Sequence, residues 1–553
     1  MEVSEKEETE PEIVGQNMDH LGLIAAMCRE LKIQERVDKR LFDGDERRKV
    51  TPGQAVTAMI LNGLGFVDHR LYMVENFYEN KPVDILLGKN LKAEYLNDYT
   101  LGHTLDEIHE YGVTNLFVEI MNEILHEKNL YGNFRRIDST SISVEGAYYD
   151  YPESDLHITY GHSKDHRPDL KQFMISLSMT GKAELPNYFE AHDGNTSDGK
   201  KFPKIIERIK KFESNLQVDE EVIYVADAAL YNEENVLSMN GVHWISRVPE
   251  TINQCREIIR IKDEEIAWKE IDKNYKGSEF TSEYGAVKQR WLLVYSHDAY
   301  KKETVTFKNK LEKINEKMDK TIKHFENKEF TSIEHGNEEL KDLVKKNKYH
   351  KIEVSKTIQT KHYHKSGRHS EKEKPERIGF KFILKYFPNE EYIQKEMNAK
   401  GRFILATNVL SENSLDSKTV LEEYKNQQHT ERGFRFLKDS KFMTDDVYLK
   451  NPDRIQSLMM IMTLCLVVYK YSQYNIRRIL EETNDTLPNQ KKKEIQNPTI
   501  KWLYQIMLGV IVLRINYDTP EEKIVMSNVN KTRKKIIRLF GKHACEIYSI
   551  NSE

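Results

Sequence analysis

Apolar side chains in the first quarter of the chain recur at helical spacing. Between residues 18 and 128 they fall three and four positions apart, a pattern typical of amphipathic helices that bury one face. Thr51 followed by Pro52 predicts a helix start, because threonine caps helices and proline is favoured in the first turn. We expect helices over residues 18–31, 51–64, 100–111 and 114–128. This all-helical region is long enough for helix-turn-helix elements.

From residue 131 the pattern becomes that of strands and then of alternating helices and strands. Residues 134–144 alternate and are rich in β-branched side chains, which is typical of a strand. The same criteria predict strands over 171–180, 185–191 and 221–226, and helices over 202–212 and 230–239. Strands followed by such alternation indicate an α/β core with a mixed sheet flanked by helices.

Residues 241 to about 410 do not continue this alternation of helices and strands. Strands are predicted over 242–248, 291–296, 378–387 and 402–408, and a charged helical stretch over about 301–350. Helices return over 417–437 and 452–474. The most apolar run, 458–469, is too short to cross about 30 Å of hydrocarbon as a helix and is interpreted as a buried core helix.

Composition and charge narrow the class of protein. The 553 residues carry 84 Lys and Arg against 89 Asp and Glu, which argues against a uniformly basic DNA coat but allows a local nucleic-acid site. Four scattered cysteines form no CxxC pair, as expected for a reducing cytoplasm. The acidic start is no secretory signal, and no GxxxxGK[ST] loop is present to indicate a P-loop ATPase.

Two aspartates occupy strand positions that suit a ligand site. Asp138 lies inside a β-branched strand, where a carboxylate is costly to bury without a charged partner. Asp227 ends another strand, and ligand sites gather at strand C-termini in α/β sheets. Taken singly, each has an equally good alternative. Asp138 could face solvent, and Asp227 could cap the helix over 230–239.

A third carboxylate stands in a polar helical segment. If residues 417–437 form one helix that continues to Lys438, then Tyr424, Gln427, Glu431 and Lys438 share an arc of roughly 60°, with Arg435 close by. One acid among Tyr, Gln, Arg and Lys suits phosphate binding beside a metal. The alternative is an exposed polar face. Carboxylates from three separate elements could hold two Mg²⁺ ions for phosphodiester chemistry.

These motifs make the chain resemble DDE transposases of bacterial and archaeal insertion sequences, in the insertion-sequence-4 group, and within it the branch with a large helical N-terminal domain. The group's spaced Tyr, Arg, Glu and Lys stand here as Tyr424, Gln427, Glu431 and Lys438, with Gln in place of Arg. Further matching segments are 161–172, 194–198, 63–67 and 79–83.

The resemblance implies an RNase H-like core whose metal ligands and catalytic residues would be Asp138, Asp227 and Glu431, with two Mg²⁺ or Mn²⁺ ions. It also implies a mainly β insertion, and the 204 residues between Asp227 and Glu431, against 89 between the aspartates, require an inserted domain. Tyr424, Gln427, Arg435 and Lys438 would contact DNA. Relatives cleave through a hairpin intermediate, and Trp291 is a candidate to stack on a flipped base, with Trp244 and Trp268 equally open. For each single tryptophan, a place in the core is the favoured alternative.

The resulting expectation is a cytoplasmic, DNA-associated prokaryotic transposase that spans no membrane. Its partners would be the terminal inverted repeats, target DNA and a second copy of the chain. A catalytically silent DNA-binding relic or repressor of the same fold is the alternative, and a metal-dependent nuclease without strand transfer is a third. The expected layout is an acidic disordered tail (1–17), a helical DNA-binding domain (18–128), the core (129–240 and 411–475), the β-rich insertion with its charged helical stretch (241–410), and a helical, basic extension (476–553).

Overall fold

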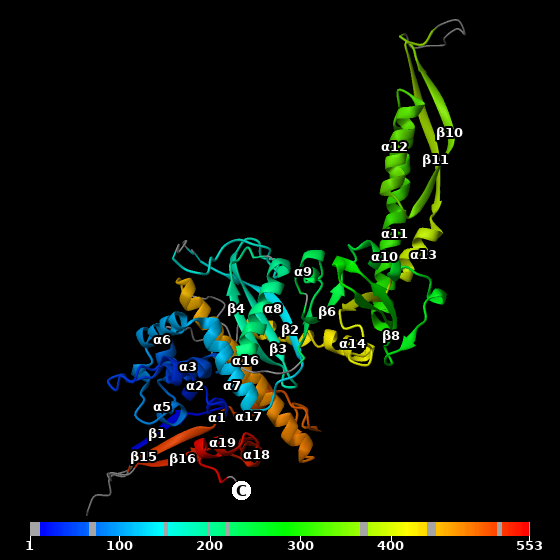
Figure 1. Ribbon diagram of the computed structural model, residues 1–553. Helices are drawn as coiled ribbons and strands as arrows, with labels where there is room; N and C mark the ends of the chain where they lie inside the picture. The colour runs from blue at the N-terminus through cyan, green and yellow to red at the C-terminus, as the bar shows by residue number, and fades with distance from the viewer. Residues whose placement is uncertain are drawn as a thin grey trace, which may run out of the picture. The chain divides into compact units, whose positions relative to one another are not determined.

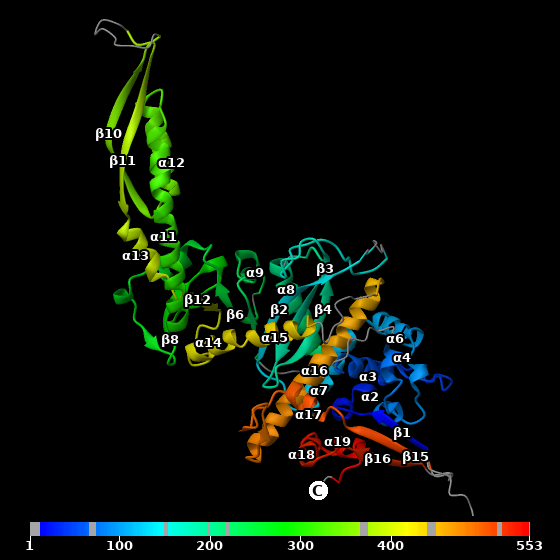
Figure 2. The ribbon, with the colours of Figure 1, turned by 180° about the vertical axis from the view of Figure 1, so that it is seen from behind.

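The chain folds into two compact units, of which the second interrupts the first. The computed structural model describes residues 12–65, 73–146, 148, 153–196, 198–215, 221–239, 241–364, 374–439, 449–516 and 522–551. The first unit comprises residues 1–244 and 423–553, and the second comprises residues 245–422. Figures 1 and 2 show the elements from opposite sides.

The N-terminal part of the first unit is helical, as the apolar spacing predicts. Thr51 and Gln54 form a capping box at the start of α3, with Pro52 in its first turn. The apolar face expected over 18–31 forms a shorter helix, α1, followed at once by α2. The helices are α1 (Leu21–Glu30), α2 (Ile33–Leu41), α3 (Pro52–Gly63), α4 (Val74–Tyr78), α5 (Val83–Leu87), α6 (Asp98–Tyr111) and α7 (Val113–Glu127).

Strands join the two ends of the described chain. β1 (Glu12–Asn17) pairs antiparallel with β15 (Ile511–Asn516), which pairs with β16 (Lys523–Ser527). The expected disordered tail over 1–17 is therefore wrong for residues 12–17, whose backbone groups the C-terminal region satisfies. That region is also not purely helical. It holds α17 (Ile500–Met507), α18 (Lys531–Leu539), α19 (Lys542–Ile547) and the short hairpin of β13 (Leu487–Pro488) and β14 (Glu494–Ile495).

A mixed sheet in the first unit carries the candidate site. Its strand order is β4-β3-β2-β5, in which β2 pairs antiparallel with β3 and parallel with β5. The predicted strand over 134–144 coincides with β2. The elements here are β2 (Phe134–Val144), β3 (Lys171–Thr180), β4 (Leu185–His192), α8 (Asp198–Asn215), β5 (Ile223–Ala226) and α9 (Glu233–Ser238).

Helix α16 (Pro452–Glu482) holds the first unit together. It packs against α3, α6 and α7 of the helical part and against β4 of the sheet (Figure 2). By length and composition it is the one helix, among the described residues, that could cross a membrane, but 78% of its most apolar window is buried inside the protein. The interpretation of its apolar run as a core helix is therefore confirmed.

The second unit contains more helix than the mainly β insertion that the resemblance implies. α11 (His297–Asn327) alone spans 31 residues and packs with α12 (Ile333–Lys346) on a hairpin of β10 (His350–His362) and β11 (Arg377–Pro388). Alternating apolar positions of the hairpin cover one face of these helices, which explains why strands and charged helices share one region. The unit also holds the strand order β6-β12-β9-β8-β7. These strands and the other helices are β6 (His243–Val248), α10 (Asn253–Ile259), β7 (Lys269–Glu270), β8 (Tyr275–Ser282), β9 (Gln289–Ser296), α13 (Glu390–Asn398), β12 (Arg402–Thr407) and α14 (Ser417–Lys425).

Candidate active site

Asp138 lies on β2, and Asp227 directly follows β5, the parallel strand that pairs with β2. Arg136 of β2 pairs with Val225 of β5, an offset of 89 residues. Asp138 and Asp227 differ by the same 89, so each stands two positions beyond that pair. Side chains alternate along a strand and parallel strands lie about 4.8 Å apart, so continuing this register one residue past Ala226 puts both carboxylates on one face of the sheet. Both residues are half-buried.

The backbone holds each aspartate in place. The amide of Ser139 donates to Asp138 Oδ1 (2.7 Å), and the amide of Ala229 donates to Asp227 Oδ1 (3.0 Å). The alternative role for Asp227 as a helix cap is wrong, because α9 begins later and is capped by the side chain of Asn232. Asp227 therefore directly follows β5, at the strand end where the sequence placed it.

The segment over residues 161–172 lies against β2 beside Asp138. The amide of Lys164 donates to Ser141 Oγ (3.0 Å), and its Nζ donates to the carbonyl of Ser139 (2.5 Å). Across the sheet, Ser139 Oγ contacts Ser176 Oγ (2.8 Å), which contacts His192 Nε2 (2.9 Å). These contacts fix both sides of the strand next to Asp138.

Glu431 lies on the exposed face of α15 (Gln428–Leu437), a helix that packs against β2 and β3. Its opposite face buries Phe434, Phe436 and Leu437. A Cβ atom on Gly433 would stand 2.7 Å from Met179 Cε, so glycine allows the helix to approach β3 closely. The helix is thus held near the strand of Asp138.

The predicted helix over 417–437 is wrong as a single helix. α14 ends at Lys425 and α15 begins at Gln428, with a turn between them. The four successive residues 425–428 are polar, so no apolar side chain at the junction is buried against the core. Packing therefore does not hold the backbone hydrogen bonds of one continuous helix together here. Tyr424 therefore belongs to α14, and the ideal line-up with Glu431 does not hold. Gln427 is the N-cap residue of α15, and its buried Nε2 has no hydrogen-bond partner in the part of the chain that the structure describes.

The two basic candidates on α15 differ in their surroundings. Arg435 is exposed and has no ion-pair partner among the described residues. Lys438 Nζ contacts both carboxylate oxygens of Asp165, at 2.7 and 2.8 Å. This ion pair therefore connects the segment 161–172 with the end of the helix that bears Glu431, and both segments match the family. The sequence showed no reason to link Lys438 with Asp165, because 273 residues separate them.

The three carboxylates do not gather into a metal cage. Within the described ranges, no group of three His, Cys, Asp or Glu side chains is placed to hold a metal ion. Asp138, Asp227 and Glu431 nevertheless offer oxygen donors, the kind that divalent ions such as Mg²⁺ prefer, from β2, from the end of β5 and from a helix packed against β2.

Trp291 is not available to stack on a base. It lies in β9 with 0% exposure, and its Nε1 donates to Gln289 Oε1 (3.1 Å). It therefore has the core role that was the alternative for each tryptophan. Trp244 is also fully buried. Trp268 is half-buried and lies under Lys276 Nζ, 4.9 Å from its ring centroid.

A half-buried ion cluster anchors the start of α15. Glu184, in the turn between β3 and β4, contacts His429 Nδ1 (2.7 Å) and Lys470 Nζ of α16 (3.4 Å). Burial alone would raise the pKa of Glu184, but the hydrogen bond from His429 and the charge of Lys470 lower it overall. Burial lowers the pKa of Lys470. A lone lysine ending an apolar run was the signal in the sequence for this cluster.

Replacing Glu184 with glutamine should therefore destabilise the protein in a pH-dependent way. A carboxylate with a lowered pKa in the folded state contributes stability above its ordinary value of 4.5 and loses it as pH falls through the folded pKa. We expect the free energy of unfolding of the wild type to exceed that of Glu184→Gln by about 1–2 kcal/mol at pH 7. This difference should disappear toward pH 3. Urea unfolding at both pH values measures this, and a difference that does not change with pH would contradict it.

The comparisons with known proteins decide the family. A model of the transposase DDE domain matches residues 133–468, more than half of the chain. The chain belongs to the DDE transposase family. This transposase also matches, over residues 13–122, a domain of unknown function, DUF4277. No curated protein matches it.

Solved transposases show only a distant likeness to this one. The piggyBac transposase synaptic complex with hairpin DNA is 8% identical, covers 90% of this chain and 82% of its own, and has a TM-score of 0.36. The Mos1 transposase paired-end complex with its left transposon end is 12% identical, covers 34% of this chain and 56% of its own, and has a TM-score of 0.15. The family match implies nuclease and transposition chemistry, which DDE domains generally carry out with divalent metals.

Proposed function

We propose that this transposase cuts DNA at the ends of an insertion sequence of the insertion-sequence-4 group and joins those ends to target DNA. The observation that carries the proposal is the placement of Asp138 on β2 and of Asp227 directly after β5, the parallel strand that pairs with β2. The packing of the Glu431 helix on β2 supports it. Three acidic residues on these elements are what a DDE reaction requires.

Asp138, Asp227 and Glu431 are the proposed ligands of two divalent ions, Mg²⁺ or Mn²⁺. Bound ions of this kind activate the attacking water or hydroxyl and stabilise the leaving oxygen. The contribution of the chain is position, because the amide of Ser139 orients Asp138 and the amide of Ala229 orients Asp227. Tyr424, Gln427, Arg435 and Lys438 are proposed to hold the DNA backbone beside them.

The placement of the three carboxylates also suggests roles for the other parts of the chain. The sheet of the first unit is proposed to be an RNase H-like core, and the second unit to be its insertion, since it separates Asp227 from Glu431 along the chain. We propose that α1–α7 bind the inverted repeats and that two copies act together, because two ends must meet. A hairpin intermediate is proposed on the resemblance to the insertion-sequence-4 group alone. The enzyme would work on DNA in a prokaryotic cytoplasm.

Cleavage of the element's own ends tests the proposal. The DNA flanking the gene should contain inverted repeats bracketed by short direct repeats, which supply the substrate duplex. Wild-type protein should nick this duplex with Mg²⁺ or Mn²⁺, leave it intact with EDTA, and join a pre-cleaved end to plasmid DNA. Binding without any cleavage would instead support the silent relic, and cleavage without joining would indicate a plain nuclease.

A further inference from the structure

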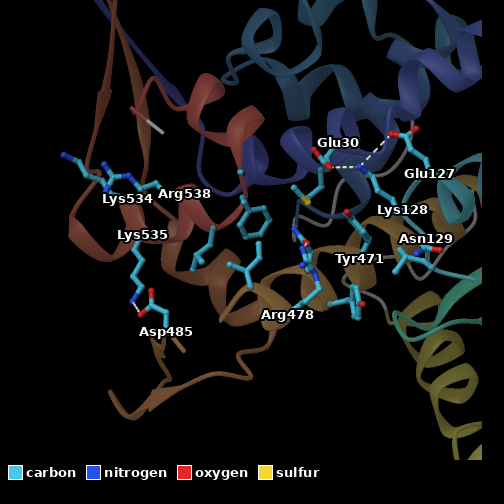
Figure 3. Close-up of a pocket in the computed structure, with 18 of the residues that line it drawn as sticks. Glu30, Glu127, Lys128, Asn129, Tyr471, Arg478, Asp485, Lys534, Lys535 and Arg538 are labelled. Atoms are coloured by element: carbon cyan, nitrogen blue, oxygen red, sulfur yellow. Dashed lines mark hydrogen bonds and ion pairs between the residues drawn. The ribbon is translucent and has the colours of Figure 1, made fainter. Parts of the chain in front are cut away.

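A pocket in the C-terminal part of the first unit is lined by an excess of positive charge. Its volume is about 1200 Å³, and α1, α7, α16 and α18 contribute its walls. Six Lys or Arg residues line it against three Asp or Glu, although the whole chain is slightly acidic. Figure 3 shows Lys534, Lys535 and Arg538 on one side and Glu30, Glu127 and Lys128 on the other.

The acidic residues of the pocket are already neutralised. Glu30 pairs with Lys128 (2.5 Å) and Asp485 pairs with Lys535 (2.6 Å). Glu127 pairs with Lys32 at 3.0 Å and with Arg36 at 2.5 Å. The lining therefore holds no unpaired acid for the other cations that α18 contributes to it, which are Lys531, Lys534 and Arg538. All three are exposed and make no ion pair with a described carboxylate.

This arrangement is unfavourable for the helix itself. α18 contains five Lys or Arg and no acid. Lys531, Lys534, Lys535 and Arg538 stand three or four positions apart on one face, where like charges repel. Lys531 and Lys534 also lie in the first turns, at the positive end of the helix dipole. The opposite face is anchored by Ile536 and Ile537, both 0% exposed, so the basic face is fixed toward the pocket.

We propose that this basic face of α18 is a second DNA-contacting surface, which binds the phosphate backbone of duplex DNA independently of sequence. Each strand of a duplex carries one charge per about 3.4 Å of axis, so the roughly 10 Å from Lys531 to Arg538 spans about three phosphates of one strand. The same pocket is also lined by the aromatic residues Tyr471, Tyr474 and Phe540. The pocket is therefore partly apolar and is not only a set of solvated charges. The inference deepens the proposed function, because it names where transposon or target DNA is held away from Asp138.

The test compares two triple variants with the same change of charge. The pocket variant is Lys531→Ala/Lys534→Ala/Arg538→Ala. The control is Lys491→Ala/Lys492→Ala/Lys493→Ala, three exposed lysines of the same C-terminal region that do not line the pocket. Fluorescence anisotropy with an end duplex and a random duplex, from 50 to 250 mM salt, measures binding. Thermal melting confirms that both variants remain folded.

We expect the pocket variant to bind both duplexes more weakly, by between about tenfold and several hundredfold at 0.1 M salt. Its slope of log K against log salt should be shallower by about 2–3, since each lost phosphate contact removes about 0.9. The control should stay close to wild type. Equal binding by the two variants overturns the inference.

Two further outcomes separate this inference from the proposed function. If the wild type binds duplexes through α18 but never cuts an end, the inference stands and the proposed function fails. If the wild type cuts and the pocket variant binds and cuts as the control does, the inference fails alone. A pocket variant that loses binding to a polyglutamate peptide but keeps its DNA affinity would assign the pocket to an acidic protein segment and overturn the inference.

Discussion

Replacing Asp138 with asparagine should reduce metal-dependent cleavage at least about a thousandfold while leaving DNA binding intact. A carboxylate that binds a catalytic ion contributes several kcal/mol to the transition state, and each 1.36 kcal/mol is a factor of ten in rate. The fold should survive, because asparagine keeps the oxygen that accepts the amide of Ser139. Single-turnover nicking of a labelled end duplex measures the loss. Asp227→Asn and Glu431→Gln should behave in the same way.

A second aspartate offers a matched control for the lost charge. Asp169 lies in the segment 161–172, whose Lys164 contacts β2, and its exposed carboxylate pairs with Arg167. Asp169→Asn removes one negative charge from the same region and should cut at close to the wild-type rate. Both proteins are stripped of divalent ions and then reloaded with Mg²⁺. If Asp138→Asn still cuts at a rate within tenfold of the wild type after this treatment, Asp138 is not a metal ligand.

Replacing Arg135 with methionine should destabilise the first unit by about 3–5 kcal/mol. The Arg135 side chain is 0% exposed. Its Nε donates to Glu213 Oε1 of α8 at 2.5 Å, and its Nη1 donates to Thr180 Oγ1 of β3 at 2.8 Å. Methionine fills much of the same volume but leaves the Glu213 carboxylate, which is only 12% exposed, without its guanidinium. The urea midpoint of unfolding should fall accordingly.

A second substitution distinguishes lost pairing from lost packing. Arg135→Met/Glu213→Leu removes both charges, and we expect it to recover most of the stability, since an apolar pair of similar volume often replaces a buried ion pair at little cost. Arg47→Met, which breaks a pair with Asp45 on a side chain 90% exposed, should leave the midpoint unchanged. A double variant as unstable as Arg135→Met would show that packing causes the effect.

Local patterns in the sequence predicted the strands and helices that bear the candidate site. β2 and β3 coincide with their predicted ranges, because alternation over ten or eleven residues is a strong local signal. Asp138 was found because it lies inside a β-branched strand, and Asp227 because it ends a strand. Helical spacing singled out Glu431 among Tyr424, Gln427 and Lys438, and the family resemblance then supplied its expected role.

Features that depend on distant residues escaped prediction. Residues 12–17 read as part of a polar tail because their pairing partner, β15, lies near the other end of the chain. The family resemblance made Trp291 a candidate for base stacking, and only the packed structure shows that it has the alternative role in the core. The turn between α14 and α15 was missed because helical conformation continues on both sides of it. In each case the deciding interaction is tertiary.

The pairing of β1 with β15 makes completion of the fold a late event in synthesis. Asn17 leaves the ribosome 494 residues before its partner Ile511. At about 10 residues per second, β1 waits most of a minute with an open edge. A message broken upstream of codon 511 would thus yield a chain whose N-terminal sheet cannot close. We expect such fragments to be degraded or to aggregate, so that they do not accumulate as DNA-binding competitors of the intact enzyme.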